Sequence, residues 1–297
     1  MIKLPEFSYL EPQTVDQALA VLMENGQDAR VLAGGTDLLV AIKHGAPAPK
    51  YVVNIKKTSP ALSYIRYDEQ ELVVRIGATT LLHDIETSTL IREQFPILAQ
   101  AAHSVGSYQV RNRATIGGNI CRASPSADNA PGLIALGAQA RIAGTGGDRS
   151  ISLEEFFVGP GKTVLQPNEL LREIQVPLCG ANAFALYVKH SVRRAMDLAT
   201  VGVAVALRFQ HGSNVVSQAR IVLGAVAPRP IRAYRAETLL VDRELDDGLL
   251  AEVGELASQE ASPISDVRAS AVYRQEMIKV ITRRALVEAA SYAGGGR

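Results

Sequence analysis

The 297-residue sequence predicts an α+β protein built from two α/β units followed by a separate α+β domain. Residues 1–60 alternate helix and strand signals, as an α/β unit does. Near Cys179 the pattern changes to three long strand candidates, and helical patterns follow from Ile231. Strands first and helices after are typical of an antiparallel sheet covered by helices. We therefore expect an N-terminal domain over 1–178, with subdomains at about 1–57 and 58–178, a C-terminal domain over 179–293, and a disordered tail at 294–297.

The first unit begins with a Thr-x-x-Gln capping-box spacing at Thr14. Apolar residues then recur at helical spacing until Asn25-Gly26, which predicts a helix that ends there. Strand candidates follow at 29–33 and 51–55, with a short helix over 36–43 between them. We expect Thr36 to cap that helix.

The second unit begins with a hairpin of residues 64–67 and 72–76. Helical spacing runs from 80 to 105 and is broken once at Pro96, and Asp128 is placed to cap a further helix through Leu136. Strand candidates at 139–142, 150–151 and 170–177 complete the unit. In the C-terminal part the long strand candidates are 184–189, 199–209 and 215–223, with a turn at 210–214.

Composition excludes several classes of function. The net charge is +1 and no block of Lys or Arg occurs, which argues against nucleic-acid binding as the main task. Two cysteines, Cys121 and Cys179, are too few for a disulfide framework, a four-cysteine zinc site or a cysteine-ligated iron–sulfur cluster. The longest apolar stretch, 199–207, is about half of the roughly 20 residues that span a bilayer. We expect no membrane span, no signal peptide and a cytoplasmic location.

The most informative segment is Val31-Leu32-Ala33-Gly34-Gly35-Thr36-Asp37-Leu38. It leaves a strand, passes two glycines and enters a helix. Glycines there permit positive φ, and free N–H groups at the helix start attract an anion such as a pyrophosphate. A tight strand-to-helix turn without a ligand is the alternative interpretation.

A second glycine pair lies in Thr115-Ile116-Gly117-Gly118-Asn119, preceded by Arg111 and Arg113. This segment again offers backbone N–H groups, with hydroxyl and amide side chains beside them, so the two loops suit a diphosphate lying between the units. Each arginine taken singly is equally consistent with a solvated group or a carboxylate partner. Neither loop matches the Rossmann or P-loop glycine pattern, which disfavours both folds.

Three further polar residues have two interpretations each. Asp128 is by itself a helix N-cap. In an alternating strand, Tyr187 and Lys189 point to one face, either toward a ligand or as a half-exposed face with a solvated lysine. The five histidines show no metal-ligand spacing and predict surface or capping roles.

These motifs together resemble the FAD-binding medium subunit of molybdenum hydroxylases, the family of xanthine dehydrogenase, aerobic carbon monoxide dehydrogenase and 4-hydroxybenzoyl-CoA reductase. The resemblance rests on the two glycine loops followed by Ala123-Ser124-Pro125 and Asp128. It extends over nearly the whole chain through segments 159–163, 167–171, 189–197 and 266–274.

The resemblance implies an FAD-binding fold of the vanillyl-alcohol-oxidase and UDP-N-acetylenolpyruvoylglucosamine-reductase type. Two α/β subdomains would hold an extended FAD, and the C-terminal α+β domain would cover part of the flavin. Residues 31–38 and 115–119 would wrap the diphosphate, and Asp128 would hydrogen-bond a polar part of the cofactor. Leu171 and Lys189 would lie near the adenine or isoalloxazine portions, where a positive charge stabilises the anionic reduced flavin. No residue is expected to be catalytic by itself, and no metal site is expected on this chain.

The family also implies partners. A large subunit would carry the molybdenum cofactor and a small subunit two [2Fe–2S] clusters, in a dimer of heterotrimers. This chain would receive electrons from the clusters and pass them to an external acceptor. An extra [4Fe–4S] cluster, as in the 4-hydroxybenzoyl-CoA reductase β subunit, is not expected because this chain lacks the insert and its cysteines. A stand-alone flavin-dependent reductase or oxidase of the same fold is the alternative, and a scaffold that has lost its flavin is a third.

Overall fold

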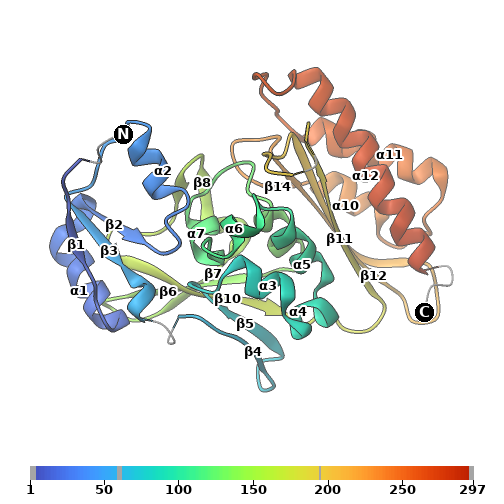
Figure 1. Cartoon of the computed structure of the whole chain (residues 1–297). Coiled ribbons are helices and arrows are strands. Elements are labelled where there is room, and N and C mark those ends of the chain that lie inside the picture. Colours follow the sequence, from blue (N-terminus) through green and yellow to red (C-terminus); the bar gives the residue numbers. More distant parts are fainter. Residues whose placement is uncertain (1–4, 59–61, 194, 294–297) are drawn as a thin grey trace.

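The computed structural model describes residues 5–58, 62–193 and 195–293, and the expected disordered tail lies outside them. Three main sheets follow one another along the chain. Figure 1 shows the N-terminal sheet and its helices at the left, a group of helices in the middle and the C-terminal sheet with its helices at the right. The predicted α+β class is confirmed.

The N-terminal unit is a three-stranded parallel sheet in the order β1-β3-β2. The strands are β1 (Ser8–Leu10), β2 (Ala29–Leu32) and β3 (Tyr51–Asn54). The helices are α1 (Val15–Asn25) and α2 (Leu38–Lys43), with single 3₁₀ turns at Gly26–Asp28 and Ile55–Thr58.

The start of α1 is capped as predicted, since the Thr14 hydroxyl accepts from the N–H of Gln17 at 3.2 Å. The reciprocal bond of the capping box is displaced by one residue, because Gln17 Oε1 accepts from Gln13 N at 2.8 Å and not from Thr14. The buried face of α1 then packs into a core shared with Ala143 and Leu170 of the next sheet. Strand β1 is absent from the sequence-based expectation, because three residues carry too short a pattern to identify.

The middle sheet has five antiparallel strands in the order β4-β5-β10-β6-β7. They are β4 (Ile65–Asp68), β5 (Val73–Gly77), β6 (Gln139–Gly144), β7 (Arg149–Ser152) and β10 (Glu169–Pro177). Strand β10 is the last of them in sequence but lies at the centre of the sheet, between the β4–β5 pair and the β6–β7 pair.

Six short helices connect β5 to β6, and one more follows β7. They are α3 (Leu82–Thr87), α4 (Thr89–Gln94), α5 (Pro96–His103), α6 (Tyr108–Arg111), α7 (Ile116–Cys121), α8 (Asn129–Ala135) and α9 (Leu153–Phe156). A two-stranded ribbon, β8 (Phe157–Gly159) with β9 (Lys162–Thr163), precedes β10. The predicted break at Pro96 is confirmed, and Ser88 adds an earlier one by capping α4.

The C-terminal sheet is antiparallel in the order β11-β12-β13-β14, as the long strand candidates predicted. The strands are β11 (Ala183–His190), β12 (Val201–Phe209), β13 (Val216–Gly224) and β14 (Ile231–Arg232). The helices α10 (Tyr234–Leu240), α11 (Asp247–Glu260) and α12 (Ala271–Ala293) follow.

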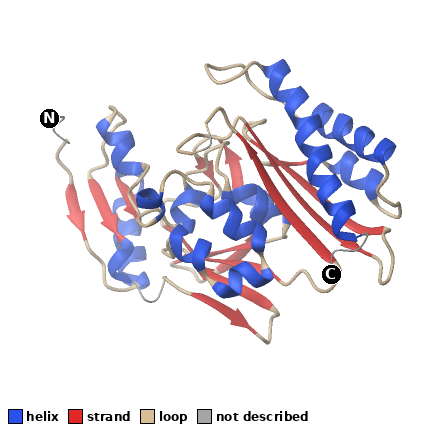
Figure 2. Cartoon of the chain, turned by 45° about the vertical axis from the view of Figure 1, so that its right-hand side comes forward, coloured by secondary structure: helices blue, strands red, loops and turns tan. Residues whose placement is uncertain are grey.

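Both faces of the C-terminal sheet are covered. One face packs on α10 to α12, and the other carries Tyr187, Ala204 and Val222 into the core of the middle region. Figure 2 shows the sheet between these two groups of helices. This second contact places β11 against α5 and α8, and β12 against α8. Among the described residues, no helix has the length and apolar character needed to cross a membrane.

Candidate cofactor-binding site

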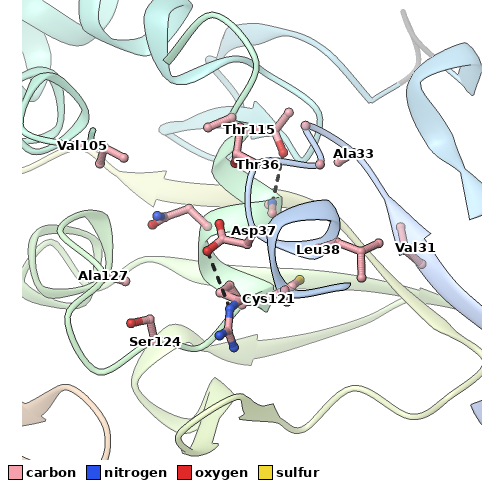
Figure 3. A pocket seen from close by; sticks show the side chains of 18 of the residues that line it. Val31, Ala33, Thr36, Asp37, Leu38, Val105, Thr115, Cys121, Ser124 and Ala127 are labelled. Carbon is pink, nitrogen blue, oxygen red and sulfur yellow. Dashed lines mark hydrogen bonds and ion pairs between the residues drawn. The ribbon is translucent and has the colours of Figure 1, made fainter. Parts of the chain in front are cut away.

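A cavity of about 790 Å³ lies where the N-terminal unit, the helices of the middle region and the β11–β12 connection meet. Its volume is within the roughly 300–1,000 Å³ of typical small-molecule sites. The wall contains residues 31–38, much of the segment from Ala114 to Asp128, Glu169–Leu171 and Met196–Leu198. Figure 3 shows residues of the first two groups facing one another across this space.

The first predicted loop, residues 31–38, lies wholly along this wall. Gly35 has φ +75°, which a side chain disfavours, and a Cβ on Gly34 would overlap the carbonyl oxygen of Arg113. The two glycines therefore turn the chain and let the two loops approach each other closely.

The same loop offers an array of hydrogen-bond donors. The backbone N–H groups of residues 34–38 have no acceptor among the described residues. Successive unpaired N–H groups at a cavity wall form a concave site for an anion. The helix α2 begins at Leu38 with Asp37 as its N-cap, and no side chain caps it. The expectation that Thr36 caps this helix was therefore wrong, and Thr36 faces the cavity instead.

The second loop differs from the expectation that its backbone N–H groups are free. The N–H groups of Ile116 and Gly117 donate to Thr80 O and Ala78 O at 3.0 and 2.9 Å. The N–H of Gly118 donates to Thr115 Oγ1 at 3.1 Å, and the N–H of Asn119 to Thr115 O at 3.0 Å. The start of α7 is thus already capped by Thr115, so the N–H groups of residues 116–119 are not free for a ligand.

The side chains of this loop supply donors as well. Thr115 and Asn119 line the cavity. Asn119 Oδ1 accepts from Asn129 Nδ2 at 3.1 Å, which directs the amide nitrogen of Asn119 elsewhere. Neither that nitrogen nor the Thr115 O–H has an acceptor among the residues the structure describes. A Cβ on Gly118 would meet only Thr115 Oγ1, at 3.0 Å, so this glycine keeps the cavity side of α7 open.

Asp128 lies on the wall but does not cap α8 through its side chain. Its Oδ1 accepts from the Tyr187 hydroxyl at 2.8 Å, and its Oδ2 accepts from Lys189 Nζ at 2.9 Å. Burial raises the pKa of Asp128, while the ammonium of Lys189 and these hydrogen bonds oppose that rise. The predicted capping role is wrong because partners from a distant strand compete for the carboxylate.

Lys189 stands behind this wall and is not among the residues that line the cavity. Besides Asp128, its Nζ donates to Ser104 O at 2.9 Å and to Asp197 O at 2.8 Å. All three ammonium protons are therefore used, and the solvated-lysine alternative is excluded. The charge is paired with Asp128 and is not presented alone to the cavity.

Tyr187 shares the face of Lys189, as predicted, but it is fully buried. Burial raises the pKa of its hydroxyl well above the ordinary value, and Asp128 adds to that rise. The ring therefore packs in the core beneath Asp128 and does not reach the cavity as the alternating pattern suggested.

Of the residues predicted for the site, all except Ile116 and Lys189 line the cavity, and Ile116 is packed in the core. Leu171 contributes from β10. Cys121 also lines the wall, and burial raises the pKa of its thiol to about 12. Arg111 takes the carboxylate alternative, since its Nε donates to Glu86 Oε2 at 2.6 Å.

Several wall residues were not predicted from the sequence, and two groups of them come from segments outside the two loops. Val105 and Gly106 follow α5, and Met196 and Leu198 belong to the β11–β12 connection. Met196 has φ +53°, which is uncommon for a residue other than glycine, so this connection is held in an unusual conformation. Asp37 forms an ion pair with Arg122 at 3.7 Å, which links the first loop to the end of α7 (Figure 3). The described residues contain no group of three or more His, Cys, Asp or Glu arranged to hold a metal ion.

Two family models cover most of the chain. Residues 5–179 match the FAD binding domain in molybdopterin dehydrogenase, and residues 186–289 match the carbon monoxide dehydrogenase flavoprotein C-terminal domain.

Relatives align over nearly the full length. The glyceraldehyde dehydrogenase medium chain of Sulfolobus acidocaldarius is 34% identical over 96% of this chain and 99% of its own. The xanthine dehydrogenase FAD-binding subunit of Escherichia coli O157:H7 is 32% identical over 97% of each chain. The structure is similar to a chain of carbon monoxide dehydrogenase from Hydrogenophaga pseudoflava, with a TM-score of 0.94, 34% identity, and coverage of 98% of this chain and 100% of that one. These matches, together with a cavity built on two glycine loops, show that the chain belongs to the family of FAD-binding medium subunits of molybdenum hydroxylases.

Proposed function

We propose that this chain is the electron-transfer flavoprotein of a three-subunit molybdenum hydroxylase. A small subunit with two [2Fe–2S] clusters would deliver electrons to it, and an external acceptor would remove them. The large subunit with the molybdenum cofactor would bind and oxidise the organic substrate. The observation that carries the proposal is the row of unpaired N–H groups at residues 34–38 along a cavity of cofactor size.

The residues of the cavity fit a diphosphate-containing cofactor. The unpaired N–H groups of the first loop supply partial positive charge, and Thr115 and Asn119 supply side-chain donors opposite them. We propose that these two loops hold the FAD diphosphate between them. Asp128 would accept from a polar group of the cofactor, Leu171 would pack against an apolar part, and Lys189 would act through Asp128.

Bound flavin accepts electrons one at a time and gives them up in pairs, chemistry that suits a junction between iron–sulfur clusters and a two-electron acceptor. The residues of this chain would bind and orient the cofactor, and Met196 and Leu198 would exclude water from one side. None of them is proposed as a general acid, base or nucleophile. We also propose a dimer of heterotrimers located in the cytoplasm.

Electron transfer from the iron–sulfur subunit, obtained by expressing the reading frame beside this one, tests this function. Reduced iron–sulfur subunit is added anaerobically to the flavin-loaded chain, and absorbance near about 450 nm is followed. Rapid bleaching is the expected result. Turnover of an organic substrate by the isolated chain, with no transfer from the iron–sulfur subunit, would instead support a stand-alone flavin reductase or oxidase.

A further inference from the structure

The FAD-type cavity is the cavity lined by residues 31–38, which we propose for FAD. A second cavity, of about 440 Å³, lies at the other end of the C-terminal sheet, on the face that carries Tyr187. Its wall is formed by the end of α8, the segment after β10, and strands β11 to β13. Two arginines, Arg208 and Arg220, line it, and no acidic residue does.

The sheet register brings the two guanidinium groups together. Arg220 is paired with Ala206, and Arg208 with Gln218, so all four side chains lie on one face. The two arginines are diagonal neighbours across β12 and β13, close enough for long side chains to converge. Both guanidinium groups also lower the pKa of the Cys179 thiol in this cavity, but burial has the larger effect and holds that pKa above its ordinary value.

Neither guanidinium has a carboxylate partner among the described residues. Arg208 Nη2 donates to Cys179 O at 2.7 Å, and Arg220 Nη1 donates to Ala135 O at 3.4 Å. A guanidinium has five N–H donors, so most of the donors on each arginine stay open. Gly137 leaves the space that Arg220 occupies, because a Cβ there would overlap Arg220 Nη1.

Apolar side chains from the end of α8 and from the segment after β10 complete this side of the wall, with Leu136 and Leu178 among them. Two open guanidinium forks next to apolar side chains match a ligand with an oxyanion at one end and a hydrocarbon portion at the other. We infer that this cavity is a binding site for a small organic carboxylate, distinct from the FAD-type cavity and formed where the C-terminal sheet meets α8 and β10.

Benzoate serves as the probe and benzamide as its neutral match. The full-length, flavin-loaded chain is titrated with each, and the melting temperature and calorimetric affinity are measured. We expect saturable binding of benzoate, an upward shift in melting temperature and no comparable effect of benzamide. We expect Arg208→Gln and Arg220→Gln each to weaken benzoate binding about tenfold, the loss of one charge-assisted hydrogen bond. Flavin absorbance should not change.

Arg235→Gln is the matched control, because Arg235 is an exposed arginine on α10 outside this cavity. Its affinity for benzoate should equal that of the wild type. Arg208 is also largely exposed, so its variant should fold even where Arg220→Gln does not. Equal binding of benzoate and benzamide, or wild-type affinity in Arg208→Gln, would overturn the inference.

Discussion

Lys189 joins three segments of the FAD-type cavity wall, and its removal should be costly. Its ammonium bonds to Ser104 O after α5, to Asp128 Oδ2 before α8, and to Asp197 O in the β11–β12 connection. Asp128 is only 5% exposed. Removing one partner of a buried ion pair costs about 3–5 kcal/mol, because the remaining charge is left uncompensated. We therefore expect Lys189→Met to destabilise the protein by about 3 kcal/mol or more and to lower FAD affinity.

A double-mutant cycle separates the pair from its surroundings. Asp128→Asn alone leaves Lys189 unpaired and should destabilise by a similar amount. The double variant Asp128→Asn with Lys189→Met has no buried charge, so its loss should be smaller than the sum of the two single losses. We expect a coupling of about 1–3 kcal/mol, as for directly contacting groups.

Urea unfolding and flavin release by fluorescence are the assays, applied to the flavin-loaded chain. Lys50→Met is the control, because Lys50 pairs with Asp28 at 2.7 Å but the two side chains are 72% and 53% exposed. An exposed pair contributes about 0–1 kcal/mol. The reasoning is refuted if Lys189→Met is no more damaging than Lys50→Met, or if the two single losses simply add.

Three further predictions concern other residues. Gly118→Val should give a folded protein with at least about tenfold weaker FAD binding, since its Cβ meets only Thr115 Oγ1 within the protein; normal flavin absorbance in the folded variant would contradict the placement of this loop. Cys121, a half-buried residue of the cavity wall with a pKa of about 12, should resist iodoacetamide at pH 8 in peptide mapping of the native protein, and rapid labelling would contradict the raised pKa. Asp266 has a pKa of about 2, lowered chiefly by the backbone N–H of Arg268. Its stabilising contribution is present above about pH 4 and is lost as the pH falls toward 2, so the melting temperature of Asp266→Asn should fall less than that of the wild type over this range.

Local patterns were enough to predict most elements of the fold. The Thr14 cap, the break at Pro96 and the long strands of the C-terminal sheet all depend on residues near in sequence. Strand β1 escaped prediction because its three residues gain their strand conformation from pairing with β3, about forty residues away.

The site was predicted less completely, because part of it depends on distant contacts. Asp128 has the local signature of an N-cap, yet Tyr187 and Lys189 capture its carboxylate across the boundary between the middle region and the C-terminal sheet. The second glycine loop has the residues of an anion site, but Ala78 and Thr80 already accept two of its N–H groups. No short-range pattern contains those partners.

The flavin content of the purified full-length chain tests the central claim most directly. The account predicts one FAD per chain, seen as absorbance bands near about 370 and 450 nm and as FAD in the supernatant after denaturation. A folded, colourless protein that does not take up added FAD would contradict it.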